Sequence, residues 1–184
     1  MTTILEDSAH SKDTATKVSA LLGGVSDVDN KTLGIAVTDV NDLGTLYFSR
    51  NAGDSWIQAN QVSLKNALLL DNQDLVYFLP QVDENGAFTD ALTFHVWDRS
   101  NAEGSGDYVD VSLDNTDASP YSADSDTVSL TVTAVNDHPA MRATTVGGNF
   151  TENAPAITLY TNAKASVGPA NESDQTLVEL TLTV

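Results

Sequence analysis

Acidic side chains recur in the same order in two parts of this chain, at spacings that suit a divalent cation. The first set is Glu6 with the pair Asp27 and Asp29, and the second is Glu152 with the pair Glu172 and Asp174. Acids at alternate positions of an extended loop can direct two carboxylates at one point, and Ca²⁺ takes about six to eight oxygen ligands. Aspartate also forms turns, which is the competing interpretation of each pair, but the repeated order favours a cation site.

Other metal motifs fit the sequence poorly. A calcium-binding helix–loop–helix starting at Asp27 would need glycine at its sixth position and an acid at its twelfth, where this chain has Thr32 and Thr38. The chain has no cysteine and only 3 histidines, which argues against zinc. Calcium is therefore the predicted cofactor.

The net charge of the chain limits its partners. With 184 residues and a formal charge of −18, the chain lacks the basic patch that nucleic-acid binding requires. No run of 18 apolar residues is present, so membrane insertion is not expected. Such a charge suits solubility through self-repulsion and the capture of cations, and most of the aspartates are expected to lie on a solvated surface.

Apolar residues alternate with polar ones in several short segments, which is the pattern of half-buried β-strands. In residues 126–135, Val128, Leu130, Val132 and Ala134 fall on one face. Strands are predicted at 33–37, 46–49, 56–59, 68–70, 76–79, 92–96, 126–135 and 178–184. Single helical turns are predicted at 18–22 and 63–67. Many short strands separated by turn residues indicate an all-β fold, an antiparallel sandwich.

The pattern restarts after an acidic junction at Asn136 and Asp137. Residues 1–138 are predicted to form one complete sandwich. Residues 139–184 supply only the opening part of a second one, because about two strands cannot close a sandwich alone. The sequence is thus interpreted as one repeat of a longer protein followed by the start of the next repeat.

Several segments resemble cadherin-like repeats of large bacterial surface adhesins, including RTX-type proteins. The resemblance is carried by the acidic opening, by residues 27–30, by residues 94–98 and by the Thr-Ala-Val-Asn-Asp junction at 133–137. It implies a cadherin- or immunoglobulin-like Greek-key topology and Ca²⁺ between consecutive repeats. It further implies a secreted or cell-surface protein that serves adhesion, with neighbouring repeats as partners and a cell-surface or glycan ligand for the parent protein.

The resemblance also implies a ligand set at each junction. For the junction after the first repeat the implied ligands are Glu6, Asp98, Asn136 and Asp137, with Glu172 and Asp174 from the following repeat. Asp27 and Asp29 would serve a junction with a preceding repeat, and Glu152 a junction with a later one. Ser100, Ala134 and His138 stand where cadherins carry Glu, Asp and Asn, which implies fewer ions or weaker binding.

Two other functions compete with this structural role, which is not enzymatic. A carbohydrate-binding sandwich would use Trp97 as a stacking surface beside His95, although His95 is more simply a strand-surface residue. A hydrolase would use Ser55 in Gly53-Asp54-Ser55, but this tripeptide lies in an expected hairpin turn rather than a nucleophile elbow. Trp56 is expected in the core.

Overall fold

The computed structural model describes residues 1–25, 27, 32–112, 119–149, 151–155, 157–166 and 168. The chain divides into two compact units, Met1–Ala134 and Val135–Val184, slightly before the boundary predicted at residue 138. The described part of the first unit consists almost entirely of strands, with one short helix, α1 (Val18–Leu21). The predicted all-β fold is therefore confirmed.

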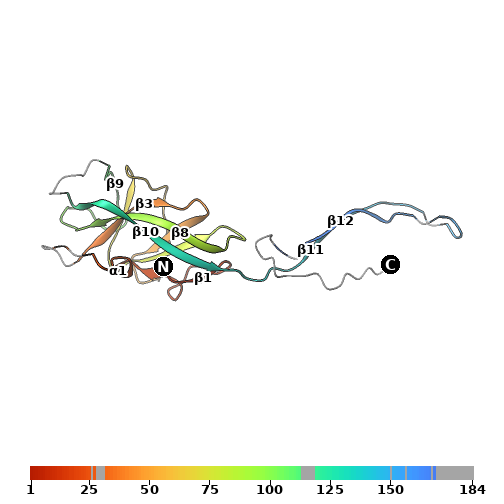
Figure 1. Ribbon diagram of the computed structural model, residues 1–184, viewed down its shortest axis with the longest axis horizontal. Coiled ribbons are helices and arrows are strands. Elements are labelled where there is room, and N and C mark those ends of the chain that lie inside the picture. Colours follow the sequence, from red (N-terminus) through yellow and green to blue (C-terminus); the bar gives the residue numbers. More distant parts are fainter. Residues whose placement is uncertain are drawn as a thin grey trace. The chain divides into compact units, whose positions relative to one another are not determined.

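The first unit is a sandwich of two sheets. The six-stranded sheet has the order β1 (Ile4–Leu5), β10 (Tyr121–Thr133), β8 (Gly86–Trp97), β3 (Gly34–Val40), β6 (Ala67–Leu70) and β9 (Tyr108–Val109), so that β1 and β9 form its two edges (Figure 1). The four-stranded sheet has the order β2 (Thr16–Lys17), β7 (Leu75–Pro80), β4 (Gly44–Ser49) and β5 (Ile57–Gln58). Neighbouring strands are antiparallel except β1, which runs parallel to β10. The Greek-key order of the strands stays a prediction.

The main core lies between the sheets and follows the alternation of the strands. On β10, Val128, Leu130 and Val132 are buried whereas the intervening Ser129 and Thr131 are exposed. Apolar side chains from both sheets meet there, among them Ile35, Leu68, Leu92 and Phe94 from the larger sheet and Leu46, Phe48 and Val76 from the smaller one. Burial of apolar surface supplies the main driving force for folding, so the core fixes which face of each strand points inward.

The predicted strands within the first unit are all present. Those at 33–37, 92–96 and 126–135 correspond to β3, β8 and β10, and the four shorter ones correspond to β4, β5, β6 and β7. The helical turn at 18–22 is α1. The turn predicted at 63–67 is wrong, because Ser63 and Asn66 form a β-bridge that leads directly into β6. The strand predicted at 178–184 lies outside the described residues.

A second, smaller core covers the outer face of the larger sheet. It is built around Trp97, which is 1% exposed, with Ala36, Ala67, Leu69, Val111 and Tyr121. The Trp97 indole donates a hydrogen bond to Asn101 Oδ1 at 2.9 Å, which satisfies its one polar atom. A Cβ on Gly34 would lie 2.8 Å from the Trp97 ring and 2.5 Å from the Leu70 carbonyl oxygen, so β3 can begin here only with glycine.

The two tryptophans differ in burial. Trp97, which the carbohydrate-binding alternative places at the surface, is buried, whereas Trp56, expected in the core, is partly exposed and packs against the edge of the core around Tyr77 and Phe78. The reason is that Trp97 faces away from the main core but is covered by the chain that follows β8, a feature that alternation along one strand does not reveal.

In the second unit, β11 (Ala140–Thr145) and β12 (Tyr160–Ser166) form an antiparallel two-stranded sheet. All residues of both strands are exposed. Two strands without a covering layer are marginally stable in water, so the described part of this unit holds no core of the kind found in the first.

We expect Trp97→Ala to destabilise the first unit by about 3–5 kcal/mol, because it empties a buried aromatic site. Trp56→Ala is the matched comparison and should cost less, because the Trp56 ring is partly exposed and only borders a core cluster. Urea unfolding of both variants measures the difference. Equal losses would contradict the assignment of Trp97 to a core.

Candidate functional site

The pairing of β8 with β10 defines two ends of the first unit. Gly86 pairs with Val132 at the end where β10 finishes, here called the junction end. Trp97 pairs with Tyr121 and with Gly34 at the other end, here called the distal end. Because β8 has 12 residues and a strand rises about 3.3 Å per residue, the two ends lie roughly 35 Å apart.

Glu6 lies at the junction end and is held firmly there. It follows β1, and its backbone N–H donates to the Thr133 carbonyl at 3.1 Å. Its side chain is only 5% exposed, and Asn85 Nδ2 donates to Glu6 Oε2 at 2.9 Å. A buried carboxylate needs hydrogen-bond partners or a cation to offset its lost hydration, so this glutamate occupies an unusual position for an acid.

Aromatic side chains fix the segment that carries Glu6. The Tyr77 hydroxyl donates to the Ser8 carbonyl at 2.6 Å. The His10 ring stacks on Tyr47 with centroids 4.7 Å apart and also lies 5.3 Å from the Trp56 ring. Sequence analysis missed this cluster, because its members come from three separate segments and only the pairing of β4 with β7 brings them together.

The turn before β8 adds further acids to the junction end. Asp83 adopts a left-handed conformation with φ 64°, and the Glu84 N–H donates to the Gln81 carbonyl at 3.1 Å. This turn delivers Asn85 to Glu6. The sequence identified residues 83–86 only as a turn, yet Asp83 and Glu84 lie at the same end as Glu6 because β8 starts there.

Asp98 lies at the distal end, so its assignment to the same site as Glu6 is wrong. It follows β8 rather than preceding it, and its N–H donates to the Pro120 carbonyl at 2.9 Å. Its Oδ1 accepts the Ser100 N–H at 2.7 Å. A calcium ion contacts its ligands at about 2.3–2.6 Å. Glu6 and Asp98 lie at opposite ends of β8, so one ion cannot contact both.

Asp27 belongs to the loop between α1 and β3. That loop leaves α1 beside the 71–74 turn, where the Ser19 N–H donates to the Asn72 carbonyl, and it ends at Gly34. Both attachment points are at the distal end, the end that also carries Asp98. Asp27 is exposed, and Asp29 lies outside the described residues.

A third group of acids at the distal end is satisfied by the protein itself. Asp74 is 5% exposed, and it accepts hydrogen bonds from the Asp71 N–H at 2.7 Å and from the Ser105 hydroxyl. Burial raises the pKa of the Asp74 carboxyl, and these hydrogen bonds offset only part of that effect. Asp71 pairs with Arg99 at 3.0 Å. This group braces the 71–74 turn.

The remaining predicted ligands belong to the second unit. Asn136 Nδ2 donates to the Asp137 carbonyl at 3.0 Å. Glu152 is exposed in a turn closed by the bond from the Ala154 N–H to the Thr151 carbonyl. Glu172 and Asp174 lie outside the described residues. Within the described ranges, no three acidic or histidine side chains come together in a group that could hold a metal.

The side chains considered for other functions have local partners. His95 Nδ1 lies 2.7 Å from the Ser122 carbonyl oxygen, as expected for a strand residue between two neighbours. The Ser55 hydroxyl accepts a hydrogen bond from Asn51 Nδ2 at 2.9 Å, in the turn between β4 and β5. Trp97 is buried and cannot serve as a sugar-stacking surface.

No protein-family model, no curated protein and no solved structure matches this chain. Among the described residues, no helix has the length and apolar character to cross a membrane.

The raised pKa of Asp74 predicts a pH-dependent stability. The folded protein holds this proton more tightly than the unfolded chain, so the contribution is favourable at low pH. It is lost as the pH rises from the ordinary pKa of 3.8 through the raised one. Asp74→Asn keeps the acceptor oxygen and removes this loss, so its stability relative to the natural protein should increase across that window.

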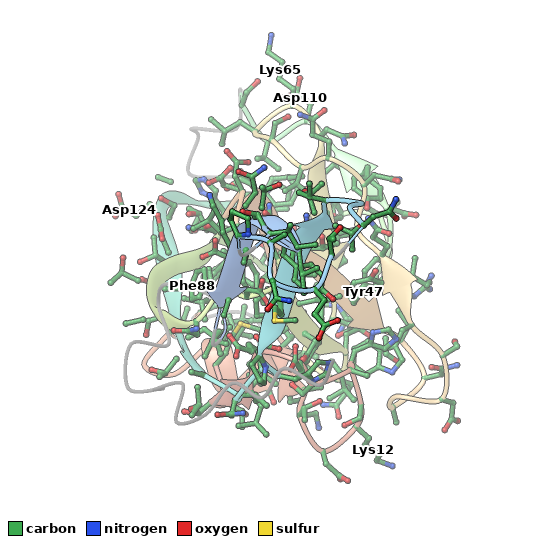
Figure 2. The ribbon with its side chains drawn as sticks, turned by 90° about the vertical axis from the view of Figure 1, so that its right-hand side faces the viewer. Lys12, Tyr47, Lys65, Phe88, Asp110 and Asp124 are labelled. Atoms are coloured by element: carbon green, nitrogen blue, oxygen red, sulfur yellow. The ribbon has the colours of Figure 1, made fainter. Side chains whose placement is uncertain are left out.

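Urea unfolding at a series of pH values measures this effect. Asp124→Asn is the control for the loss of one negative charge, since Asp124 projects from the surface of β10 (Figure 2). Identical pH profiles for the two variants would contradict the assignment.

Proposed function

We propose that this chain is a calcium-binding structural repeat of a secreted or cell-surface bacterial adhesin, stiffened by Ca²⁺ at the connection between repeats. The observation that carries the proposal is Glu6, a buried carboxylate held at the end where β10 leaves the domain. The role is structural rather than catalytic, and its partners are neighbouring repeats of the same chain.

In this proposal, donors from this repeat and from the next one form the cation site together, since the described acids do not gather as a group of three by themselves. Glu6, Asp83 and Glu84 offer carboxylates, and the side chain of Asn85 already orients one oxygen of Glu6. Asn136 and Asp137 follow β10 directly in the sequence, and Glu172 and Asp174 would complete the set. Calcium prefers carboxylate and amide oxygens of this kind. Asp83 and Glu84 take the place of Asp98 in this proposal.

The distal end would serve a preceding repeat in the same way. Its candidate ligands are Asp27 and Asp29, on the loop before β3, and Asp98, on the turn after β8. In a head-to-tail array, each repeat takes part in one junction at each of its two ends. Each end therefore needs its own acids. Glu152 would act in the second repeat as Glu6 acts in the first.

Charge gives calcium a large effect on such a chain. At a formal charge of −18, the acids repel one another, and a bound divalent cation removes part of that repulsion. An ion that binds only the folded junction stabilises it by about 2.7 kcal/mol at roughly one hundred times its Kd. An array would therefore be loose where calcium is scarce and stiff outside the cell.

The carbohydrate-binding alternative loses its expected site, because the Trp97 ring is 1% exposed. The hydrolase alternative has no observation in its favour. The calcium proposal is therefore the one that the described residues support best.

We expect calcium at about one hundred times its Kd to raise the melting temperature of the chain by roughly 10 °C, and a chelator to reverse the change. Glu6→Gln should remove at least half of the calcium-dependent shift, because it deletes a carboxylate while keeping the acceptor for Asn85. Differential scanning calorimetry with and without calcium measures the shift.

Glu103→Gln provides the matched control, because Glu103 is exposed between β8 and β9 and takes no part in the proposed set. A melting curve that calcium leaves unchanged would sink the proposal. A calcium shift that survives Glu6→Gln would instead place the ion away from the junction end.

A further inference from the structure

A cavity of about 260 Å³ opens beside the β3–β4 turn. That turn is hydrogen-bonded to Gln81, in the turn that also carries Asp83 and Glu84, but none of the proposed calcium ligands lines the cavity. One wall is the end of β3 with the β3–β4 turn, and the other is the segment 59–62, which follows β5. Segment 59–62 lies on the path from the four-stranded sheet to β6 of the six-stranded one. The cavity thus lies where the chain passes between the two layers.

Hydrogen bonds hold both walls in place. The Ala59 N–H donates to the Leu46 carbonyl at 2.9 Å, and the Asn60 N–H donates to the Tyr108 hydroxyl at 2.8 Å. Across the turn, the Gly44 N–H donates to the Asn41 carbonyl at 3.1 Å. The cavity is therefore formed before any ligand arrives, which lowers the entropic cost of binding.

The cavity combines an apolar floor with a polar rim. The apolar lining consists of Val40, Leu46, Ala59 and Val62, and these residues belong to or pack on the main core. The rim carries two carboxylates and two carboxamides: Asp39, Asp42, Asn60 and Gln61.

The rim side chains have hydrogen-bonding capacity to spare. Four rim side chains have no hydrogen-bond partner among the described residues of the protein: Asp39, Asp42, Asn60 and Gln61. Their neighbour Asn41 is different: its Nδ2 donates to Asp90 and its Oδ1 accepts the Leu43 N–H, both at 3.0 Å. Asn41 therefore braces the turn, while the exposed rim side chains are available to a ligand.

We propose that this cavity binds a single uncharged sugar ring, such as the terminal residue of a neutral glycan. A sugar ring offers an apolar C–H face to the floor and hydroxyl groups to the rim. Carboxylates accept hydrogen bonds from hydroxyls more strongly than neutral groups do, and carboxamides both donate and accept.

Size and charge narrow the ligand class. The volume is slightly below the range of about 300–1,000 Å³ typical of drug-sized ligands, so one ring fits better than a longer oligomer. Two carboxylates at the rim of a chain with a formal charge of −18 disfavour acidic sugars. This site differs from the Trp97 surface considered from the sequence, and it does not depend on the calcium proposal.

Nuclear magnetic resonance titration of the whole chain with methyl glycosides of glucose, galactose, mannose and N-acetylglucosamine tests the proposal. At least one should shift the amide signals of residues 39–46 and 59–62 selectively. The double variant Asp42→Asn with Asn60→Ala should weaken that binding at least tenfold. Both positions are exposed, so the variant should keep the melting temperature of the natural protein. If it unfolds, the single variant Gln61→Ala should weaken binding threefold or more.

Asp124→Asn, on the exposed face of β10, is the control and should leave the binding unchanged. Each titration is run in calcium and in chelator, and equal binding in both supports a site separate from the proposed metal. The proposal is overturned if none of the four glycosides causes shifts, if the shifts fall elsewhere, or if both variants bind alike. Equal binding of glucuronic acid would overturn the preference for uncharged sugars.

Discussion

The antiparallel pairing of β8 with β10 is the constraint on which the arrangement of this protein depends. It places Gly86 beside Val132 and Trp97 beside Tyr121, and so decides which loops gather at each end of the first unit. The turn before β8 lies at the same end as β1 and the end of β10. The turn after β8 lies at the same end as the start of β3. The length of β8 holds these two ends roughly 35 Å apart. An acid that follows β8 therefore cannot bind the same ion as an acid at the start of β8.

The acids of the first unit fall into groups with different surroundings. Asp74 is buried and satisfied by Ser105 and the Asp71 amide, so it stabilises a turn. Glu6 is equally buried but lies at the end of the domain, with Asn85 orienting one oxygen. Asp39 and Asp42 are exposed at the rim of a cavity. Composition counts all of these residues alike, yet burial and hydrogen bonding suit them to three different tasks.

Aromatic residues show most clearly where sequence patterns stop being informative. The alternation along β10 correctly separated buried from exposed positions, because one face of that strand meets the main core. Trp97 follows the same parity rule and points away from that core, but a second core formed with Val111 and Tyr121 covers it. His10, Tyr47 and Trp56 pack together on the four-stranded sheet although no spacing relates them.

The sequence by itself determined the all-β class, the positions of the longer strands in the first unit and the abundance of oxygen ligands, since alternation and composition are local properties of the chain. It also singled out Glu6 through the repeated acids, but the pairing of β1 with β10 decides where Glu6 lies. The sequence did not reveal the two-residue strands β1, β2 and β9. Only the tertiary structure decided that Asp98 lies apart from Glu6, that Asp83 and Glu84 lie with it, and that a cavity opens beside Asn60. These facts depend on strand pairing between distant segments, which is fixed by packing in three dimensions and leaves no periodic mark in the sequence.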